Sequence, residues 1–329
     1  MNRRTLVGLA LTLPAWSAAL AQPSRRLAIV SPGEPLAIMS ETGGNAYYRV
    51  LFEDLRSLGQ VEGRTLIVQR YGRERALEIG IEKMIAEAVA GRPDVIYAIG
   101  GAGLVKAATQ TIPIVALTGD PVALGLAQSV ARPGGNVTGV SVDTGPSLYG
   151  KRIELLREVK PGVSRIGYVT TQRVWEILQG KPMRAAAEAA GVSLLPSLVG
   201  MPAAASDYAD AVRRAAAEGA DALMIGDGPE ALQYRDAIVG AVETTRLPAI
   251  YTFPESAAAG GLIAYSFDLK DLNRQAARDI DAILRGASPA EIPFYQVTRL
   301  LLSVNLKTAR RLGIELAPAL VARADDVID

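Results

Sequence analysis

The 329-residue sequence contains no cysteine and no histidine. Without cysteine it forms no disulfide and offers no thiolate to a metal ion or a substrate. Without histidine it lacks the commonest general base and the commonest metal ligand. Carboxylates, lysines and tyrosines remain, but no two carboxylates stand at a spacing that indicates a catalytic pair. We therefore expect a protein without catalytic residues, metal ligands or a cofactor.

The sequence also lacks an excess of charge of either sign. Lysine and arginine number 35 against 34 aspartate and glutamate, and no basic tract interrupts this balance. A nucleic-acid-binding surface needs such an excess, so no nucleic acid partner is expected. No G-x-x-x-x-G-K-[ST] phosphate-binding motif occurs, and Gly100-Gly101-x-Gly103 lacks the spacing of a dinucleotide-binding loop. What remains is a chain of ordinary globular composition, long enough for two domains.

The N-terminal segment has the pattern of an export signal. Arg3 and Arg4 precede an apolar stretch, Leu6–Leu20, which is too short to span a bilayer comfortably. The small-x-small sequence that ends at Ala21 is typical of a cleavage site. We expect residues 1–21 to be a signal peptide and the mature chain to be periplasmic. An uncleaved anchor remains the alternative, and the two arginines leave both the general and the twin-arginine export routes open.

From Leu27 onward, short apolar runs alternate with amphipathic segments. Runs such as Val95–Ile99 lack polar positions, as expected for strands covered on both faces. A first series predicts strands at Leu27–Val30, Thr65–Val68, Val95–Ile99 and Ile114–Leu117, with helices at about 45–58, 77–90 and 104–110. A second series predicts helices at about 146–159, 181–190, 206–218 and 229–244, with strands at Arg165–Val169, Ser193–Leu198, Ala222–Ile225 and Ala249–Tyr251. After these series, strands are expected at Leu262–Ser266 and Leu300–Val304, and helices at Leu269–Leu284 and Leu306–Leu312.

This alternation predicts an α/β protein with two doubly wound parallel-sheet lobes joined by a hinge. Residues 119–140, GDPVALGLAQSVARPGGNVTGV, are too rich in proline and glycine for a continuous helix, and we interpret them as the first crossover. Lobe 1 is then expected to comprise residues 22–120 plus about 257–294. Lobe 2 is expected to comprise residues 121–256 plus about 295–329. Hinge residues are expected near 118–120 and 253–257.

A ligand site is expected where the carboxyl ends of the parallel strands of the two lobes face each other. The residues there are small, hydroxylic, acidic or aromatic, and they suit a small polar molecule. Helix N-termini at such an edge favour an anionic group on the ligand. The candidate ligand-binding residues are Ser31, Gly100, Gly101, Thr118, Asp120, Thr170, Thr171, Asp227, Tyr251 and Phe253.

Several of these candidates have a structural alternative. Gly100 and Gly101 also suit a simple strand-to-helix turn. Asp227 either holds a ligand ammonium or caps the helix that begins at Pro229, and Asp120 has the same ambiguity with a stronger indication of a cap or hinge. Tyr251 and Phe253, like Trp175, either stack on a flat ligand or pack in the core.

Four segments resemble the ABC transporter substrate-binding protein family, whose better-known members are linked to tryptophan and tyrosine uptake. They are GDPVALGLAQSVARPGGNVTGVS, GKRIELLREVKPGVSRIGYV, RLPAIYTFPESAAAGGLIAYSFDLKDLNRQAARDIDAILRGASPAEIPFYQ and NLKTARRLGIELAPALVARADDVID. The resemblance implies a type I periplasmic binding fold with two α/β lobes, three crossovers and a ligand in the cleft. Family members usually carry an Asn-Pro loop where this chain has residues 170–175, and the loop at residues 31–44 is longer than usual. Both departures lie at the expected cleft. We therefore do not infer from the family resemblance that the ligand is an aromatic amino acid.

Together these observations predict an exported, monomeric solute-binding protein of an ABC-type uptake system. Its expected ligand is a small polar molecule, such as an amino acid or a related carboxylate, and its expected partner is an inner-membrane permease. A periplasmic sensor that presents its closed form to a membrane receptor is the main alternative. An enzyme on this fold is disfavoured by the missing histidine and cysteine. A gene regulator would need a DNA-binding helix pair where the predicted signal peptide stands.

Overall fold

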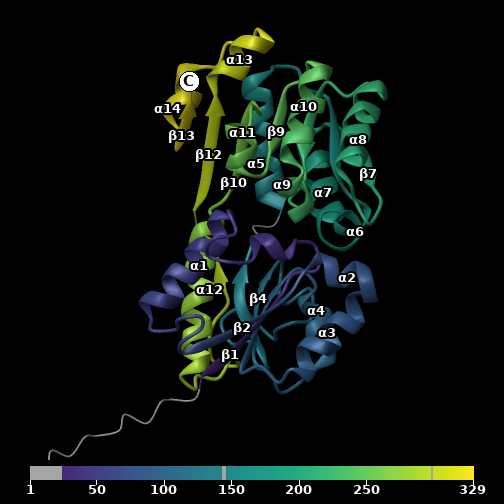
Figure 1. Ribbon diagram of the computed structural model, residues 1–329. Coiled ribbons are helices and arrows are strands. Elements are labelled where there is room, and N and C mark those ends of the chain that lie inside the picture. The colour runs from purple at the N-terminus through teal and green to yellow at the C-terminus, as the bar shows by residue number, and fades with distance from the viewer. Residues whose placement is uncertain (1–23, 143–145, 298) are drawn as a thin grey trace, which may run out of the picture.

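The computed structural model describes residues 24–142, 146–297 and 299–329, so the predicted signal peptide lies outside the described residues. Within them the chain forms two α/β units, each built on its own sheet (Figure 1). The predicted fold class is therefore confirmed. None of the described helices is both long and apolar enough to cross a bilayer.

The described part of the first sheet has six strands, all parallel. In spatial order they are β11 (Tyr295–Gln296), β5 (Val137–Ser141), β4 (Ile114–Thr118), β3 (Val95–Ile99), β1 (Arg25–Val30) and β2 (Leu66–Tyr71). Its helices are α1 (Ala46–Ser57), α2 (Arg73–Ile79), α3 (Ile81–Ala90), α4 (Ala102–Ala108) and α12 (Leu269–Leu284), with a short turn of 3-10 helix, η1 (Leu36–Ile38).

Strand β1 shows how this sheet is buried on both faces. Leu27 and Ile29 pack with α1 and α12, whereas Ala28 and Val30 pack with α3 and α4. Figure 1 shows α1 and α12 on one side of the sheet and α3 and α4 on the other. Since successive side chains of a strand point to opposite faces, both faces demand apolar residues, and this explains the unbroken apolar runs in the sequence.

The second sheet has seven strands in the described residues, and only the β10–β12 pair is antiparallel. In spatial order they are β13 (Asp326–Ile328), β12 (Leu300–Asn305), β10 (Ile263–Phe267), β9 (Ala249–Tyr251), β8 (Ala222–Ile225), β6 (Arg165–Thr171) and β7 (Ser193–Val199). Its longer helices are α5 (Pro146–Val159), α7 (Gly180–Ala190), α8 (Ala205–Ala217), α10 (Arg235–Thr245) and α13 (Leu306–Leu312). Shorter helical pieces are α6 (Gln172–Val174), the π-helical turn η2 (Trp175–Gln179), α9 (Pro229–Gln233), α11 (Pro254–Ala258) and α14 (Pro318–Ala322).

Two helices predicted as continuous are divided. Helix 77–90 starts earlier and is split into α2 and α3 at Gly80, which has a φ of 89°. Glycine takes this conformation without the steric cost that a side chain brings. Helix 229–244 is divided at Tyr234 into α9 and α10. Each helix is divided by a local change in backbone conformation. The spacing of apolar residues, on which the predictions rested, does not indicate such a change.

The predicted boundary at residue 120 is wrong. Strand β5 pairs with β4 in the first sheet, and Leu126 is buried in the core of that unit. Residues 119–140 are therefore a connection within the first unit and not a crossover. The chain leaves this unit only after β5 and enters the second with α5.

The two later boundaries also shift. Strand β10 belongs to the second sheet, so the chain returns to the first unit at Asp268, the N-cap of α12, and not near residue 257. Strand β11 still pairs with β5, and the chain crosses for the last time between β11 and β12. The chain thus passes between the units three times, as the resemblance implied. The predicted hinges at 118–120 and 253–257 lie inside the units and are not the connections between them.

Candidate functional site

The carboxyl ends of the parallel strands in the two units face each other, and side chains make contacts across this boundary. The Arg73 guanidinium, just after β2, donates to the side-chain oxygen of Gln233 at 2.5 Å and to the Tyr234 hydroxyl at 3.2 Å. The Tyr47 hydroxyl on α1 donates to a carboxylate oxygen of Glu255 on α11. The space between the units is thus bordered by polar groups of both, and we take it as the candidate site.

On the first unit, the site is built around Glu34 in the loop after β1. The Ser31 hydroxyl donates to Glu34 Oε2 at 2.7 Å, and the Tyr48 hydroxyl donates to the same oxygen at 2.5 Å. Burial raises the pKa of Glu34, although these two hydrogen bonds act in the opposite direction. Ser31, a predicted site residue, therefore acts as a support for a carboxylate that the sequence analysis did not single out.

On the second unit, Glu230 in the first turn of α9 faces this loop. Only 8% of Glu230 is exposed, and burial raises the pKa of its carboxyl. A side chain at Gly33, one residue before Glu34, would meet Glu230 Oε1 at 3.2 Å. Glycine at position 33 thus allows the backbone of the first unit to approach a carboxylate of the second.

Asp227, a predicted site residue, forms the centre of a hydrogen-bond network in the second unit. Arg152 is fully buried and donates to Asp227 Oδ1 at 2.6 Å, and Tyr149 donates to Oδ2 at 3.3 Å. The Thr252 hydroxyl also donates to Oδ1. The helix-cap alternative is wrong, because Gly228 is the N-cap of α9 and no side chain caps it. Asp227 instead neutralises a buried arginine.

Thr170 and Thr171 end β6 in two different roles. The Thr170 hydroxyl donates to the side-chain oxygen of Gln179 at 2.9 Å, and Tyr168 donates to the same oxygen at 2.8 Å. The Thr171 hydroxyl accepts the amide of Val174 at 3.4 Å and so caps α6. Both threonines are almost fully buried.

The first-unit candidates other than Ser31 lie at the end of a strand or in the turn that follows one. The Asp120 carboxylate accepts the amides of Val122 and Ala123, but the segment that follows is a turn and not a helix, so Asp120 stabilises a turn and is not a helix cap. Gly100 and Gly101 have φ values of 67° and 86° and lead from β3 into α4. Thr118 ends β4 and is half-buried.

Tyr251 and Phe253 are packed in the core of the second unit. They are 2% and 4% exposed and lie in one apolar cluster with Val212 and Ile238. The packing alternative therefore holds for both. Trp175 is also buried, next to Tyr168 at 5.6 Å between ring centroids.

Sequence reasoning missed the charged residues that matter most here: Glu34, Arg152 and Glu230. For Arg152 a signal was present, since it falls between Leu148 and Leu156 on the apolar stripe of a predicted helix. A charged residue at such a position is buried only with a partner. Glu34 and Glu230 lie in loop and first-turn positions where solvent-exposed glutamates are also common, so no sequence signal distinguishes them.

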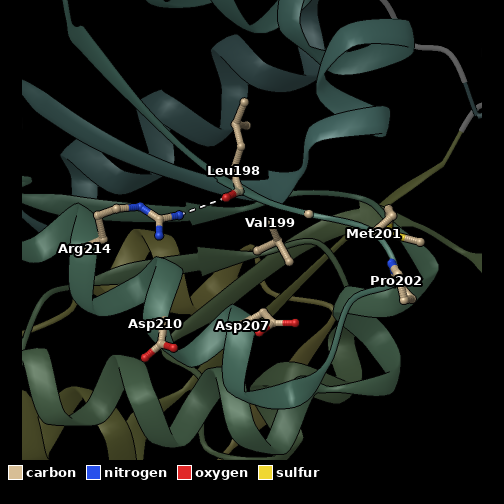
Figure 2. Close-up of a pocket in the computed structure, with 8 residues that line it drawn as sticks. Leu198, Val199, Met201, Pro202, Asp207, Asp210 and Arg214 are labelled. Atoms are coloured by element: carbon tan, nitrogen blue, oxygen red, sulfur yellow. Dashed lines mark hydrogen bonds between the residues drawn. The ribbon is translucent and has the colours of Figure 1, made fainter.

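Two surface cavities lie in the second unit apart from this network. One of about 370 Å³ is bordered by the end of β7 and by α8 (Figure 2). Its polar groups bond locally, since Arg214 donates to the Leu198 carbonyl at 2.9 Å and Asp207 accepts the Ala204 amide. The other, of about 480 Å³, lies between α10 and α13, where Arg311 pairs with Glu243. The polar groups named at both cavities are thus already paired with neighbouring groups, so we do not take either cavity as the candidate site.

The described residues contain no group of three or more histidine, cysteine, aspartate or glutamate side chains that could hold a metal ion. The boundary between the units offers carboxylates, hydroxyls and arginines, and such groups suit hydrogen bonding to a small molecule.

Comparisons with known proteins give the context. A curated tyrosine-binding protein of Clostridioides difficile (strain R20291) is 24% identical over 243 residues, which cover 71% of this chain and 67% of that protein. A crystal structure of a conserved domain protein from Vibrio cholerae has a TM-score of 0.81 at 24% identity and covers 92% of this chain and 99% of its own. An ABC domain in complex with L-Trp from Streptococcus pneumonia has a TM-score of 0.79 at 22% identity, with 93% and 100% covered.

These structural likenesses extend over nearly the whole chain and support the two-unit architecture described above. The model of the ABC transporter substrate binding protein family matches residues 36–328. That range contains both sheets except β1, all three passages between the units, and Glu230 and Arg73 at their boundary. The chain therefore belongs to the ABC transporter substrate-binding protein family.

Proposed function

We propose that this protein is the exported solute-binding component of an ABC-type uptake system and that it binds a small polar ligand between its two units. The observation that carries this proposal is the set of polar side chains, from both units, that meet at the carboxyl ends of the two sheets. A ligand that contacts both units at once stabilises the form in which they are closed on each other.

The ligand class is an amino acid or a related small carboxylate. The relatives that bind tryptophan or tyrosine favour an amino acid. The loop that contains Glu34 and the segment from Thr170 to Trp175 differ from the usual family pattern, so an aromatic side chain is not a requirement of this proposal. Buried Thr170 and Gln179 supply polar support on one side of the site, and Arg73 supplies a positive charge on the other.

The closed, ligand-bound form would be delivered as a monomer to a permease in the inner membrane. Residues 1–21 would direct the chain to the periplasm and be removed after Ala21. No chemical conversion of the ligand belongs to this role, since binding and release are sufficient for delivery.

The test is a thermal-shift and calorimetric screen of the mature chain against amino acids and small carboxylates. At a ligand concentration 100 times Kd, one-site binding adds about 2.7 kcal/mol to the free energy of unfolding, which a melting experiment detects. Small-angle scattering with and without the hit should show compaction. If a broad panel neither stabilises nor compacts the protein, the proposal fails.

A further inference from the structure

Glu230 carries a buried carboxylate oxygen that lacks a hydrogen-bond partner among the described residues. Its Oε2 atom is inaccessible to solvent and accepts no hydrogen bond from any described residue. The whole residue is only 8% exposed. Burial of a carboxylate oxygen without a donor is costly, so its persistence at this site indicates a missing partner.

The Tyr208 hydroxyl lies at the same place and is also without a hydrogen-bond partner among the described residues. Tyr208 is 0% exposed. Both polar atoms surround Gly228: a side chain there would meet Glu230 Oε2 at 3.1 Å and the Tyr208 hydroxyl at 4.0 Å. Because position 228 is glycine, the backbone lies close to both unpaired atoms without a side chain that would press against Glu230 Oε2.

The opposite unit adds a second carboxylate to the same boundary. Gly33 approaches Glu230 Oε1, and the next residue is Glu34, whose Oε2 is already held by Ser31 and Tyr48. The two carboxylates are near enough for the charge of Glu34 to raise the pKa of Glu230. Like charges brought together at a buried boundary repel unless a cation or a proton lies near them.

The arginines near this pair do not form hydrogen bonds with it in the described structure. A hydrogen bond from the backbone amide of Glu230 itself lowers the pKa of its carboxyl, and Arg173 and Arg73 lower this pKa through their charge. The Arg73 guanidinium donates instead to Gln233 and Tyr234. The boundary between the units thus has two carboxylates and lacks a donor that bonds to Glu230 Oε2.

We propose that the ligand supplies this donor as a positively charged nitrogen, of which a primary ammonium is the most compact form, bound by Glu230 with Glu34 facing it from the other unit. This inference rests on the proposed solute-binding function and narrows it to ligands that carry an amine. Closure then brings the two carboxylates together around the cation, so a ligand without that charge leaves them repelling each other.

The experiment compares ligand pairs that differ only in the amine. The mature chain is titrated calorimetrically with the proteinogenic amino acids and with small diamines, and in parallel with deaminated acids, dicarboxylates and neutral sugars. For each amino acid that binds, the matching deamino acid is then measured. We expect binders to carry a cationic nitrogen and the deamino partner to bind at least about 30-fold more weakly, because a buried carboxylate loses its partner.

Two variants test whether Glu230 and Glu34 bind the amine. Glu230→Gln and Glu34→Gln keep the size of the side chain and remove its charge, and each should weaken the amine ligand by about 10-fold or more. The matched control is Glu188→Gln, on the exposed face of α7. It should bind like the unmodified chain. Circular dichroism and thermal melting confirm that each variant is folded.

The outcomes separate the two proposals. Tight binding of a ligand without a cationic nitrogen, or unchanged binding by folded Glu230→Gln and Glu34→Gln proteins, overturns the amine inference and leaves solute binding intact. Stabilisation by sodium or calcium salts alone would overturn it as well, because the site would then hold an inorganic cation. If none of the compounds binds, the solute-binding proposal itself fails, and this inference fails with it.

Discussion

At the scale of single residues, the Arg152–Asp227 pair is an ion pair in the interior of the second unit. Arg152 is fully buried, and besides Asp227 it donates to the Tyr265 carbonyl at 2.9 Å. The pair links α5 to the loop after β8 and to the backbone of β10. Such a pair contributes little net stability over an apolar replacement, but removal of one partner leaves a buried charge alone.

We predict that Asp227→Ala destabilises the protein by about 3 to 5 kcal/mol, because the Arg152 charge loses its counterion in the interior. Chemical denaturation of the mature chain measures this change. The double variant Arg152→Met with Asp227→Ala should recover a large part of the loss. The single variant Arg152→Met completes the comparison. If the destabilisation of the double variant equals the sum of the two single destabilisations, the charge-pair explanation is wrong.

Asp279 on α12 gives a pH-dependent contribution to stability. Burial raises the pKa of Asp279 to about 7, while a hydrogen bond from Gln275 and the charge of Arg278 act against this. The folded state therefore binds a proton that the unfolded state has already released above about pH 4. The contribution of Asp279 to the free energy of unfolding is therefore most favourable below that pH. It falls as the pH rises toward 7, by up to about 1.4 kcal/mol per pH unit.

The variant Asp279→Asn should remove this dependence, since an amide keeps the hydrogen-bonding shape and carries no charge at any pH. We expect the variant to be more stable than the unmodified chain at pH 8 and similar to it at pH 4. Urea denaturation at both pH values measures the difference. An equal difference at the two pH values would show that Asp279 does not titrate in this range.

At the scale of secondary-structure elements, strand β5 decides where the first unit ends. Its Gly139 has a φ of 138°, and a side chain there would collide with the carbonyl oxygen and the amide nitrogen of Ala116 on β4. The absence of a side chain lets the two strands pair at this point. Thr138 ties the same strand to the segment after α12 by donating to the Ile292 carbonyl at 2.7 Å.

We predict that Gly139→Ala costs at least about 3 kcal/mol, because a methyl group adds both a collision and an unfavourable backbone conformation. Gly135→Ala is the matched control four residues earlier, where a side chain would meet nothing within 4 Å. Thermal melting of both variants is the measurement. Similar melting temperatures for the two would mean that β5 tolerates a side chain and that this account of the pairing is incorrect.

At the scale of the whole molecule, closure depends on a few polar contacts between the units. Tyr47 reaches Glu255, and Arg73 reaches Gln233 and Tyr234. These contacts are absent when the units are apart, so each one adds to the stability of the closed form only. A change in any of them shifts the balance between the two forms.

We predict that Tyr47→Phe shifts the ligand-free protein toward the open form and weakens ligand binding by about 10-fold or more, because a hydrogen bond to a charged carboxylate contributes about 1.5 to 3 kcal/mol. Because the chain has no cysteine, two introduced thiols, one on α3 and one on α8, would be the sole labelling sites. Distance measurements between spin labels at these sites report the population of each form. Unchanged distances and affinity in Tyr47→Phe would remove Tyr47 from the closing contacts.

The sequence by itself determined the local structure and the fold class. Apolar runs flanked by turn residues located β1 to β4, β6 to β10 and β12, since a strand buried on both faces excludes polar residues wherever it lies, whereas β5 was not predicted. The missing cysteine and histidine restricted the chemistry, and the family resemblance indicated three passages between the units. Those properties depend on residue type and spacing alone.

Only the tertiary structure decided which strands share a sheet and which charges meet. A strand such as β5 has the same apolar pattern in either unit, so its pairing with β4 is visible only in the folded chain. Glu34 and Glu230 are almost two hundred positions apart in the sequence, and each would be ordinary on an exposed loop. Their role arises because the two sheets place them at one buried boundary, where a charge that water would screen needs a partner.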